Sequence, residues 1–141
     1  MKTAALFIIV ASELLLAISA HSGDACIPKD SHVKALSYPN DIPGVLLEVL
    51  TNHVGEIAPP RGMFNPSDVI RKGIPDRRVM FVWNRGTRYV IASEHGGIGY
   101  NNPIFLYEVD QKNNTATLIS EQIADSDAAI CKLSNSLIMS K

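Results

Sequence analysis

The sequence predicts an α+β fold, in which one N-terminal amphipathic helix packs on a four-stranded antiparallel β-meander and one disulfide links the termini. Three patterns predict this fold. Apolar residues recur at helical spacing between positions 42 and 54, the period changes to two from position 78 onward, and two cysteines lie far apart in the chain. With 141 residues, 46% of them hydrophobic, the chain is long enough for one globular core.

Residues 1–20 have the pattern of a secretory signal peptide. Lys2 supplies the positive start, an apolar stretch follows, and small residues precede a cleavage point after Ala20. Cleavage after Ser22 and a buried N-terminal helix are the alternatives. Glu13 interrupts the apolar stretch and would be costly at the centre of a bilayer, so a permanent anchor is disfavoured.

We therefore expect a signal peptide at 1–20 and a single α+β domain at 21–141. Such a protein would be exported to a periplasm or to the extracellular space, with no stable membrane anchor after signal cleavage. The net charge is −1, with 13 basic and 14 acidic side chains. This balance lacks the positive charge of a general nucleic-acid binder, so no nucleic-acid partner is expected.

Cys26 and Cys131 are the two cysteines of the sequence. In an oxidising compartment the default expectation is that they form one disulfide. Asp24 and the end of the apolar stretch argue against lipidation of Cys26. The sequence has no CxxC motif and no third cysteine, which argues against a metal or catalytic role for the pair.

The first part of the expected domain is an extended arm, residues 21–40, followed by the helix. Asn40 or Asp41 can cap this helix, Pro43 suits its first turn, and Gly55 is a natural stop. The apolar stripe of the helix consists of Ile42, Val45, Leu46, Val49, Leu50 and Val54.

Residues 58–76 are rich in proline and glycine and predict a loop, with one short helical turn over 67–72 that Ser67 would cap. Strands rich in β-branched and aromatic residues follow. The four expected strands are 78–83, 88–93, 103–109 and 115–120. A polar segment, 124–129, then leads to Cys131.

The loop 94–102 is the most unusual stretch of the sequence. Its three glycines permit a close approach of the backbone, while Glu94, His95, Tyr100 and Asn101 offer hydrogen-bonding groups of several kinds. The loop could recognise a partner, His95 could act as a general base, or the glycines could merely serve a wide connection.

Arginines cluster around the first expected hairpin. Arg78 and Arg88 could face each other across it and, with Arg77 and Arg85, form a basic patch. Such a patch could anchor an acidic partner, or it could simply discourage aggregation at a sheet edge. The residues expected to bind a partner are Arg85, Arg88, Glu94, His95, Tyr100 and Asn101.

The sequence contains no GxSxG elbow and no HExxH motif, so no catalytic residue is assigned and no cofactor is expected. His53 and Glu56 could share a helix face but need a third ligand, so no metal is expected. Asn113 begins a glycosylation sequon, which matters only in a eukaryote.

The expected function is that of a small exported protein, of a bacterial periplasm, that binds another protein. Its most concrete form is an inhibitor or immunity protein that blocks an enzyme or toxin in the same compartment. The first alternative is a secreted hydrolase or lyase that uses His95 with Glu94 or Asp76. The second is a small-molecule or cell-wall binding module with its site between helix and sheet.

Overall fold

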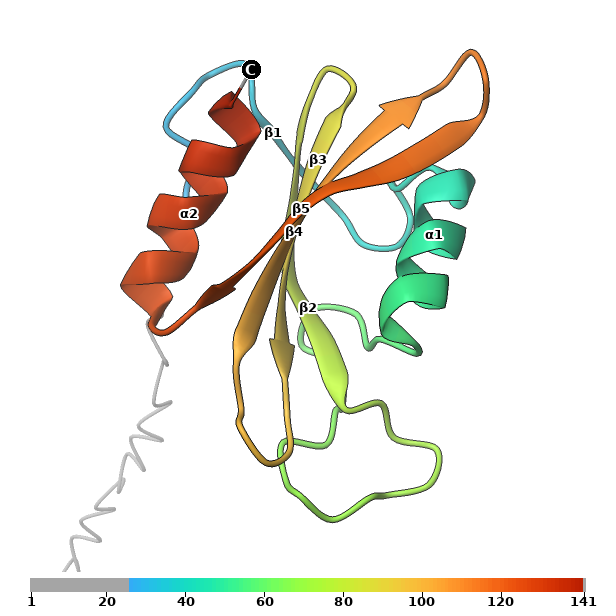
Figure 1. Cartoon of the computed structure of the whole chain (residues 1–141), viewed down its shortest axis with the longest axis vertical. Helices are drawn as coiled ribbons and strands as arrows, with labels where there is room; N and C mark the ends of the chain where they lie inside the picture. The colour runs from blue at the N-terminus through green and yellow to red at the C-terminus, as the bar shows by residue number, and fades with distance from the viewer. Residues whose placement is uncertain (1–25, 141) are drawn as a thin grey trace, which may run out of the picture.

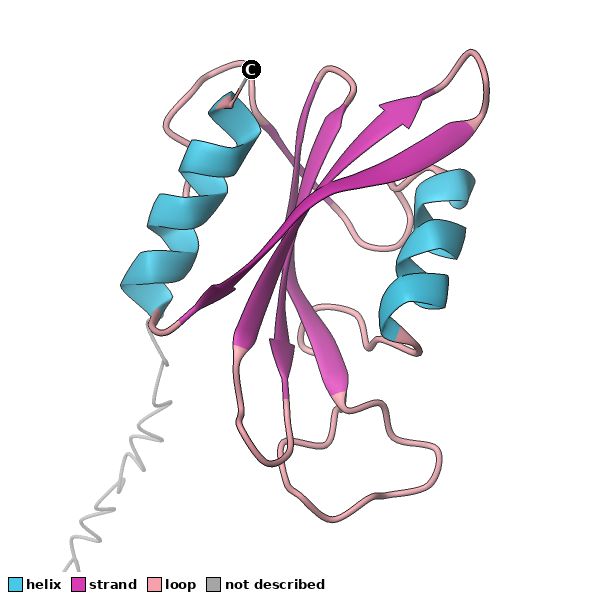
Figure 2. Ribbon diagram, in the orientation of Figure 1, coloured by secondary structure: helices cyan, strands magenta, loops and turns pink. Residues whose placement is uncertain are grey.

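A five-stranded antiparallel sheet lies between two helices, one on each face (Figure 1; Figure 2). The computed structural model describes residues 26–140. The predicted signal peptide and its cleavage point lie outside these residues. The strands are β1 (Lys34–Leu36), β2 (Arg77–Arg85), β3 (Arg88–His95), β4 (Asn102–Asp110) and β5 (Thr115–Ala124), and the helices are α1 (Gly44–Val54) and α2 (Asp127–Met139).

The predicted fold class is wrong, because the structure has a fifth strand and a second helix. The expected helix and four strands are present as α1 and β2 to β5, but β1 pairs with β2 and α2 covers the opposite face of the sheet from α1. β1 has three residues, too few for a periodic pattern to reveal. The segment predicted as polar contains the start of α2, whose N-cap Ser126 accepts a hydrogen bond from the Ala129 amide at 3.3 Å.

The strand order in the sheet is the order in the chain, β1 to β5, so every strand pairs with its sequence neighbours. The register places the arginines of the β2–β3 hairpin near its two ends. Arg85 pairs with Arg88 at one end of the β2–β3 hairpin, and Arg78 pairs with Glu94 at the other end. The expected pairing of Arg78 with Arg88 is therefore wrong. At about 3.3 Å per residue, Arg78 and Arg85 of β2 lie roughly 20 Å apart.

Each helix packs on its own apolar core. Leu46 and Leu50 of α1 are fully buried against sheet residues such as Phe105 and Tyr107. On the other face, Ile130 and Ile138 of α2 pack in a second core. The sheet residues of that core include Trp83, Val90, Ile104 and Leu106. Both faces of the central strands are consequently buried, which explains their nearly continuous apolar sequences.

The predicted disulfide is confirmed: Cys26 is bonded to Cys131 of α2, with 5.4 Å between their Cα atoms. It joins the N-terminal arm to the last helix, and the Lys29 amide adds a 2.9 Å hydrogen bond to Asn135 Oδ1. A disulfide is consistent with an oxidising compartment. Neither helix within residues 26–140 combines the length and the apolar character needed to cross a membrane.

Candidate functional site

Two loops leave the sheet at the end where Arg78 pairs with Glu94. Residues 59–76 lead into β2, and residues 96–101 connect β3 to β4; we call these two segments the loop end (lower part of Figure 1). Gly96 donates its amide hydrogen to Asp76 O at 2.8 Å, and Gly97 donates to Pro66 O at 3.3 Å. The two loops are thus joined by backbone hydrogen bonds.

Gly96 is the position where the loops touch most closely. A Cβ atom there would lie 2.1 Å from Asn65 O, so only glycine fits. Asn65 is itself buried: its Nδ2 donates to Val69 O at 2.6 Å, and its Oδ1 accepts from the Ser67 hydroxyl at 2.7 Å. The helical turn predicted at 67–72 is absent, because the Asn65 side chain organises this segment as bends instead.

Glu94 is the centre of a side-chain network that braces the loop end. Its Oε1 accepts from Arg78 Nε at 2.6 Å, and its Oε2 accepts from the Tyr100 hydroxyl at 2.7 Å. The Arg78 guanidinium lies 4.4 Å from the centre of the Phe64 ring and donates from Nη1 to Gly62 O at 3.3 Å. The Glu94 carboxylate therefore connects β3 to β2 and to the loop 96–101, and Arg78 extends the network to the loop 59–76.

The environment of Tyr100 favours its neutral form. Desolvation, followed by the hydrogen bond to Glu94 and the negative charge of Glu94, raises the pKa of Tyr100 to about 12. The hydroxyl therefore acts as a donor at every physiological pH. This donor keeps the ring of Tyr100 attached to β3, although the side chain remains exposed.

His95 belongs to a second, separate pair. Its Nε2 lies 3.3 Å from Asp76 Oδ2, the residue that ends the long loop. The sequence suggests Glu94 or Asp76 as the carboxylate that pairs with His95. In the structure Asp76 contacts His95, whereas Glu94 bonds to Arg78 and Tyr100. The imidazole and the Asp76 carboxylate form the kind of acid–base pair used in proton transfer.

Not all of the predicted partner-binding residues come together. Glu94, His95 and Tyr100 lie at the loop end, and Asn101 lies beside them with its Nδ2 donating to Gly99 O at 2.8 Å. Arg85 and Arg88 lie at the opposite end of the hairpin. Both arginines make contacts within the chain. Arg85 Nε lies 3.1 Å from Asp30 Oδ2, and Arg88 Nη1 donates to Ser140 Oγ at 3.2 Å.

Apolar side chains project from both loops into solvent. Ile70 is 93% exposed and Ile98 is 91% exposed. The other exposed large apolar side chains of the loop end are Met63, Val69 and Tyr100. Sequence reasoning missed Met63, Val69 and Ile70, although apolar residues inside a proline-rich and glycine-rich loop were a visible signal. It also missed Asn65, because a single asparagine in a loop carries no pattern.

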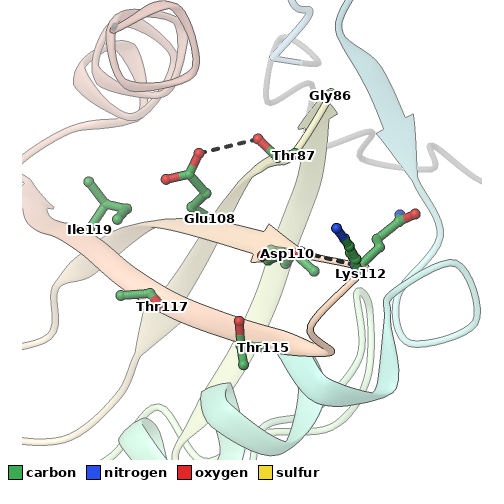
Figure 3. Close-up of a pocket in the computed structure, with 10 residues that line it drawn as sticks. Gly86, Thr87, Glu108, Asp110, Lys112, Thr115, Thr117 and Ile119 are labelled. Atoms are coloured by element: carbon green, nitrogen blue, oxygen red, sulfur yellow. Dashed lines mark hydrogen bonds between the residues drawn. The ribbon is translucent and has the colours of Figure 1, made fainter.

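Grooves flank the loop end on two sides. One of about 770 Å³ is lined by Arg78 and Glu94 together with Tyr38 and Arg61, and one of about 480 Å³ is lined by Asp76, Gly96, Ile70 and the end of α1. A third cavity, of about 730 Å³, lies far from them at the β4–β5 turn (Figure 3). There the Thr87 hydroxyl donates to Glu108 at 3.3 Å, and none of the predicted site residues lines the cavity.

Two other expectations concern α1. A small-molecule or cell-wall binding module would have its site between α1 and the sheet. This space is filled by buried apolar side chains. His53 pairs with Glu121 of β5 at 3.1 Å rather than with Glu56. Within residues 26–140, no cluster of three or more His, Cys, Asp or Glu side chains is placed to hold a metal ion.

No protein-family model, curated protein or solved structure matches the chain.

Proposed function

We propose that this chain is a small exported protein that binds another protein through its loop end, as an inhibitor or immunity protein that blocks an enzyme or toxin in the same compartment. The observation that carries the proposal is the concentration of exposed apolar side chains on two braced loops. Of nine large apolar side chains exposed within residues 26–140, five belong to the loop end. A cluster of this kind typically marks an interaction site.

The bracing supports binding rather than a passive connection. The Glu94 network and the close contact of Gly96 with Asn65 hold both loops in place before a partner binds. Little conformational entropy of the loops therefore remains to be lost on association. A rigid projection with an aromatic residue and isoleucines at its tip can fill a cleft of a partner. Such a projection can block an enzyme by occupying its cleft.

The charge around the apolar side chains favours an acidic partner. Arg61, Arg71 and Lys72 are exposed and outnumber the exposed Asp68 of the same loop, and within the described part of the chain none of these three cations forms an ion pair. Cations at the rim of an interface steer a partner of opposite charge and reject one of like charge. Binding would therefore weaken as the salt concentration rises.

The test uses exposed isoleucines in matched positions. The mature protein would be immobilised to capture its partner from the exported fraction of its own cells, and the affinity for the identified partner would then be measured. Ile70→Asp and Ile98→Asp should each weaken binding at least about tenfold, because each places a charge in an apolar contact. Ile27→Asp is the control, since Ile27 is 72% exposed but lies on the arm.

Equal losses for all three variants, or no loss for the two loop variants, would contradict the proposal. Failure to capture any protein from the exported fraction would count against it as well. Far-UV circular dichroism of each variant verifies that the substitutions leave the fold intact.

A secreted hydrolase or lyase is the second candidate. The observation that favours it is the 3.3 Å contact between His95 and Asp76 beside the groove of about 480 Å³ that Asp76 lines. His95→Ala discriminates between the two functions. It would abolish turnover in an acid–base enzyme, but it would weaken protein binding only by a modest factor because His95 braces the loops without being the apolar contact.

A further inference from the structure

The two edges of the sheet differ in how they are protected. On the β2 side, β1 pairs with Val82, Trp83 and Asn84, and Ala58 forms a bridge with Arg78 just before two prolines. On the other side, β5 has no pairing strand along its outer edge among the described residues. Figure 1 shows β5 in front of the sheet with no helix or loop across it.

β5 also lacks most of the residues that keep an edge strand from pairing. Its ten residues include no lysine, arginine, proline or glycine, and its one charged residue, Glu121, is paired with His53 at 3.1 Å. Ile119 is 49% exposed and Ile123 is 63% exposed. A bulge is the one protective feature: the β4–β5 register shifts so that Ile119 has no partner in β4.

We propose that β5 pairs antiparallel with β5 of a second copy of this chain, around a two-fold axis near Ile119, so that two five-stranded sheets join into one. A two-fold interface is self-complementary, so each copy supplies the same edge. This interface is separate from the loop end and does not depend on its function.

The charge pattern of β5 and its flanks fits this arrangement. In a register centred on Ile119, the residue n positions after Ile119 in one copy opposes the residue n positions before it in the other. Glu121 then faces Thr117, and Ile123 faces Thr115, so no like charges are paired along the strand. Outside the strand, the turn before β5 carries Lys112 and the segment after β5 carries Asp125 and Asp127, so the antiparallel arrangement brings a basic flank of one copy toward an acidic flank of the other.

The oligomeric state of the mature protein tests the proposal. Sedimentation velocity from low to high micromolar concentration should show a monomer–dimer equilibrium for the wild type. Ile119→Lys and Thr117→Lys should each shift the dissociation constant by at least tenfold toward monomer, because a buried lysine on each strand blocks the pairing. Ile98→Lys, at the loop end, should leave the dimer unchanged.

A cross-link tests the register. Ile119→Cys should form a covalent dimer under oxidising conditions, because residues at the two-fold axis face each other within about 5 Å. Thr117→Cys should form much less of it, because Thr117 opposes Glu121 rather than itself. Thermal unfolding of each variant shows whether the monomer is folded, and the two positions give independent readings if one variant fails to fold.

Three outcomes would overturn the proposal. The wild type could remain a monomer at every concentration. The dimer could persist in both β5 variants and disappear in Ile98→Lys, which would place the interface at the loop end. A monomeric wild type could lose its captured partner in the β5 variants, which would mean that the edge accepts a strand of another protein.

Discussion

At one end of the β2–β3 hairpin Arg78 braces two loops through Glu94, whereas at the other end Arg85 and Arg88 fasten the two terminal segments. Arg85 pairs with Asp30 of the arm, and Arg88 donates to Ser140 just after α2. The same residue type, in the same hairpin, thus closes the molecule at one end and supports an exposed surface at the other.

This difference shows why a cluster of arginines in a sequence is a weak guide to a binding surface. Arg85 and Arg88 already have partners within the molecule, Asp30 and Ser140. Mutations of these two arginines should therefore affect stability and leave partner binding intact. Mutations at the loop end should affect both. Variants at the two ends should therefore differ in whether partner binding changes together with stability.

Removal of the disulfide should have the largest effect on stability. Replacing Cys26 and Cys131 by serine opens a loop of 105 residues, and the chain-entropy model gives a loss of roughly 4–5 kcal/mol in the free energy of unfolding. Urea unfolding measures this loss, and reduction of the wild type should reproduce it. Under folding conditions, the folded fraction should still bind the partner; a loss of binding in the folded fraction would remove the distinction between the ends.

Gly96→Ala should be next. The new methyl group would lie 2.1 Å from Asn65 O, so the two loops must separate at a cost of about 1–3 kcal/mol. Partner binding should weaken together with stability. Gly44→Ala is the matched control, because a Cβ at Gly44 has no atom within 4 Å and alanine favours helix. Equal losses in the two variants would show that the loop contact is unimportant.

Glu94→Gln should cost about 1–2 kcal/mol, because the partly buried Arg78 loses its charged partner and Tyr100 loses a strong acceptor. Limited proteolysis should show faster cleavage in residues 96–101. Glu108→Gln is the control at the other end of the sheet, where Glu108 is exposed and accepts one hydrogen bond from Thr87. Cleavage at the wild-type rate in Glu94→Gln would contradict the bracing role.

Arg85→Ala should have a smaller effect that depends on pH. The pKa of Asp30 is lowered, first by the backbone hydrogen bond from His32 and then by the charges of His32 and Arg85. Because the folded state lowers this pKa, the ionised Asp30 carboxylate stabilises the fold at pH values above the ordinary Asp value of 3.8. This stabilisation is lost as the pH falls below 3.8 and through the lowered pKa.

Unfolding curves between pH 7 and pH 3 would measure this effect. The variant should show a weaker decline in stability with acid than the wild type, and its partner binding should be unchanged. An equal decline would mean that the arm contact contributes nothing to acid stability.

Tyr100→Phe should have the smallest effect near neutral pH, about 1 kcal/mol for the lost hydrogen bond. At high pH its effect is specific. Because the pKa of Tyr100 is raised from 10.0 to about 12, the unfolded chain releases this proton first, and the stability of the wild type falls as the pH rises between these values.

Tyrosinate absorbance measures the shift directly. Burial also raises the pKa of Tyr38, and it raises the pKa of Tyr107 to about 12, so Tyr100→Phe should remove one late-titrating tyrosine from the wild-type curve. A late-titrating fraction of the same size in the wild type and in Tyr100→Phe would show that the Tyr100 hydroxyl is not held by Glu94.

The parts of the fold that the sequence predicted are those with a strong period. β2, β3 and β4 each contain four or five consecutive apolar residues, β5 alternates between exposed and half-buried positions, and α1 carries a complete apolar stripe. α2 was missed because a polar residue, Ser134, is buried at the central position of the stripe that Ile130, Leu137 and Ile138 form. Tertiary packing, not propensity, decides this helix.

The site was predicted in part for a related reason. Glu94, His95 and Tyr100 follow one another along one strand and its loop, so sequence proximity was sufficient to group them. The contacts of Glu94 with Arg78 and of Gly96 with Asn65 join segments 16 or more residues apart. These two contacts depend on the register of the β2–β3 hairpin and on the path of the loop 59–76. Neither can be predicted from the spacing of residues in the sequence.

The order of the strands also bears on how the chain reaches its fold. Because β2 to β5 pair with immediate neighbours through short connections, the centre of the sheet can form as successive hairpins with a small loss of chain entropy at each step. β1 and the arm must instead close long loops onto β2 and α2. We expect the sheet centre to form early and these terminal segments to dock late, with the disulfide retaining them once they have arrived.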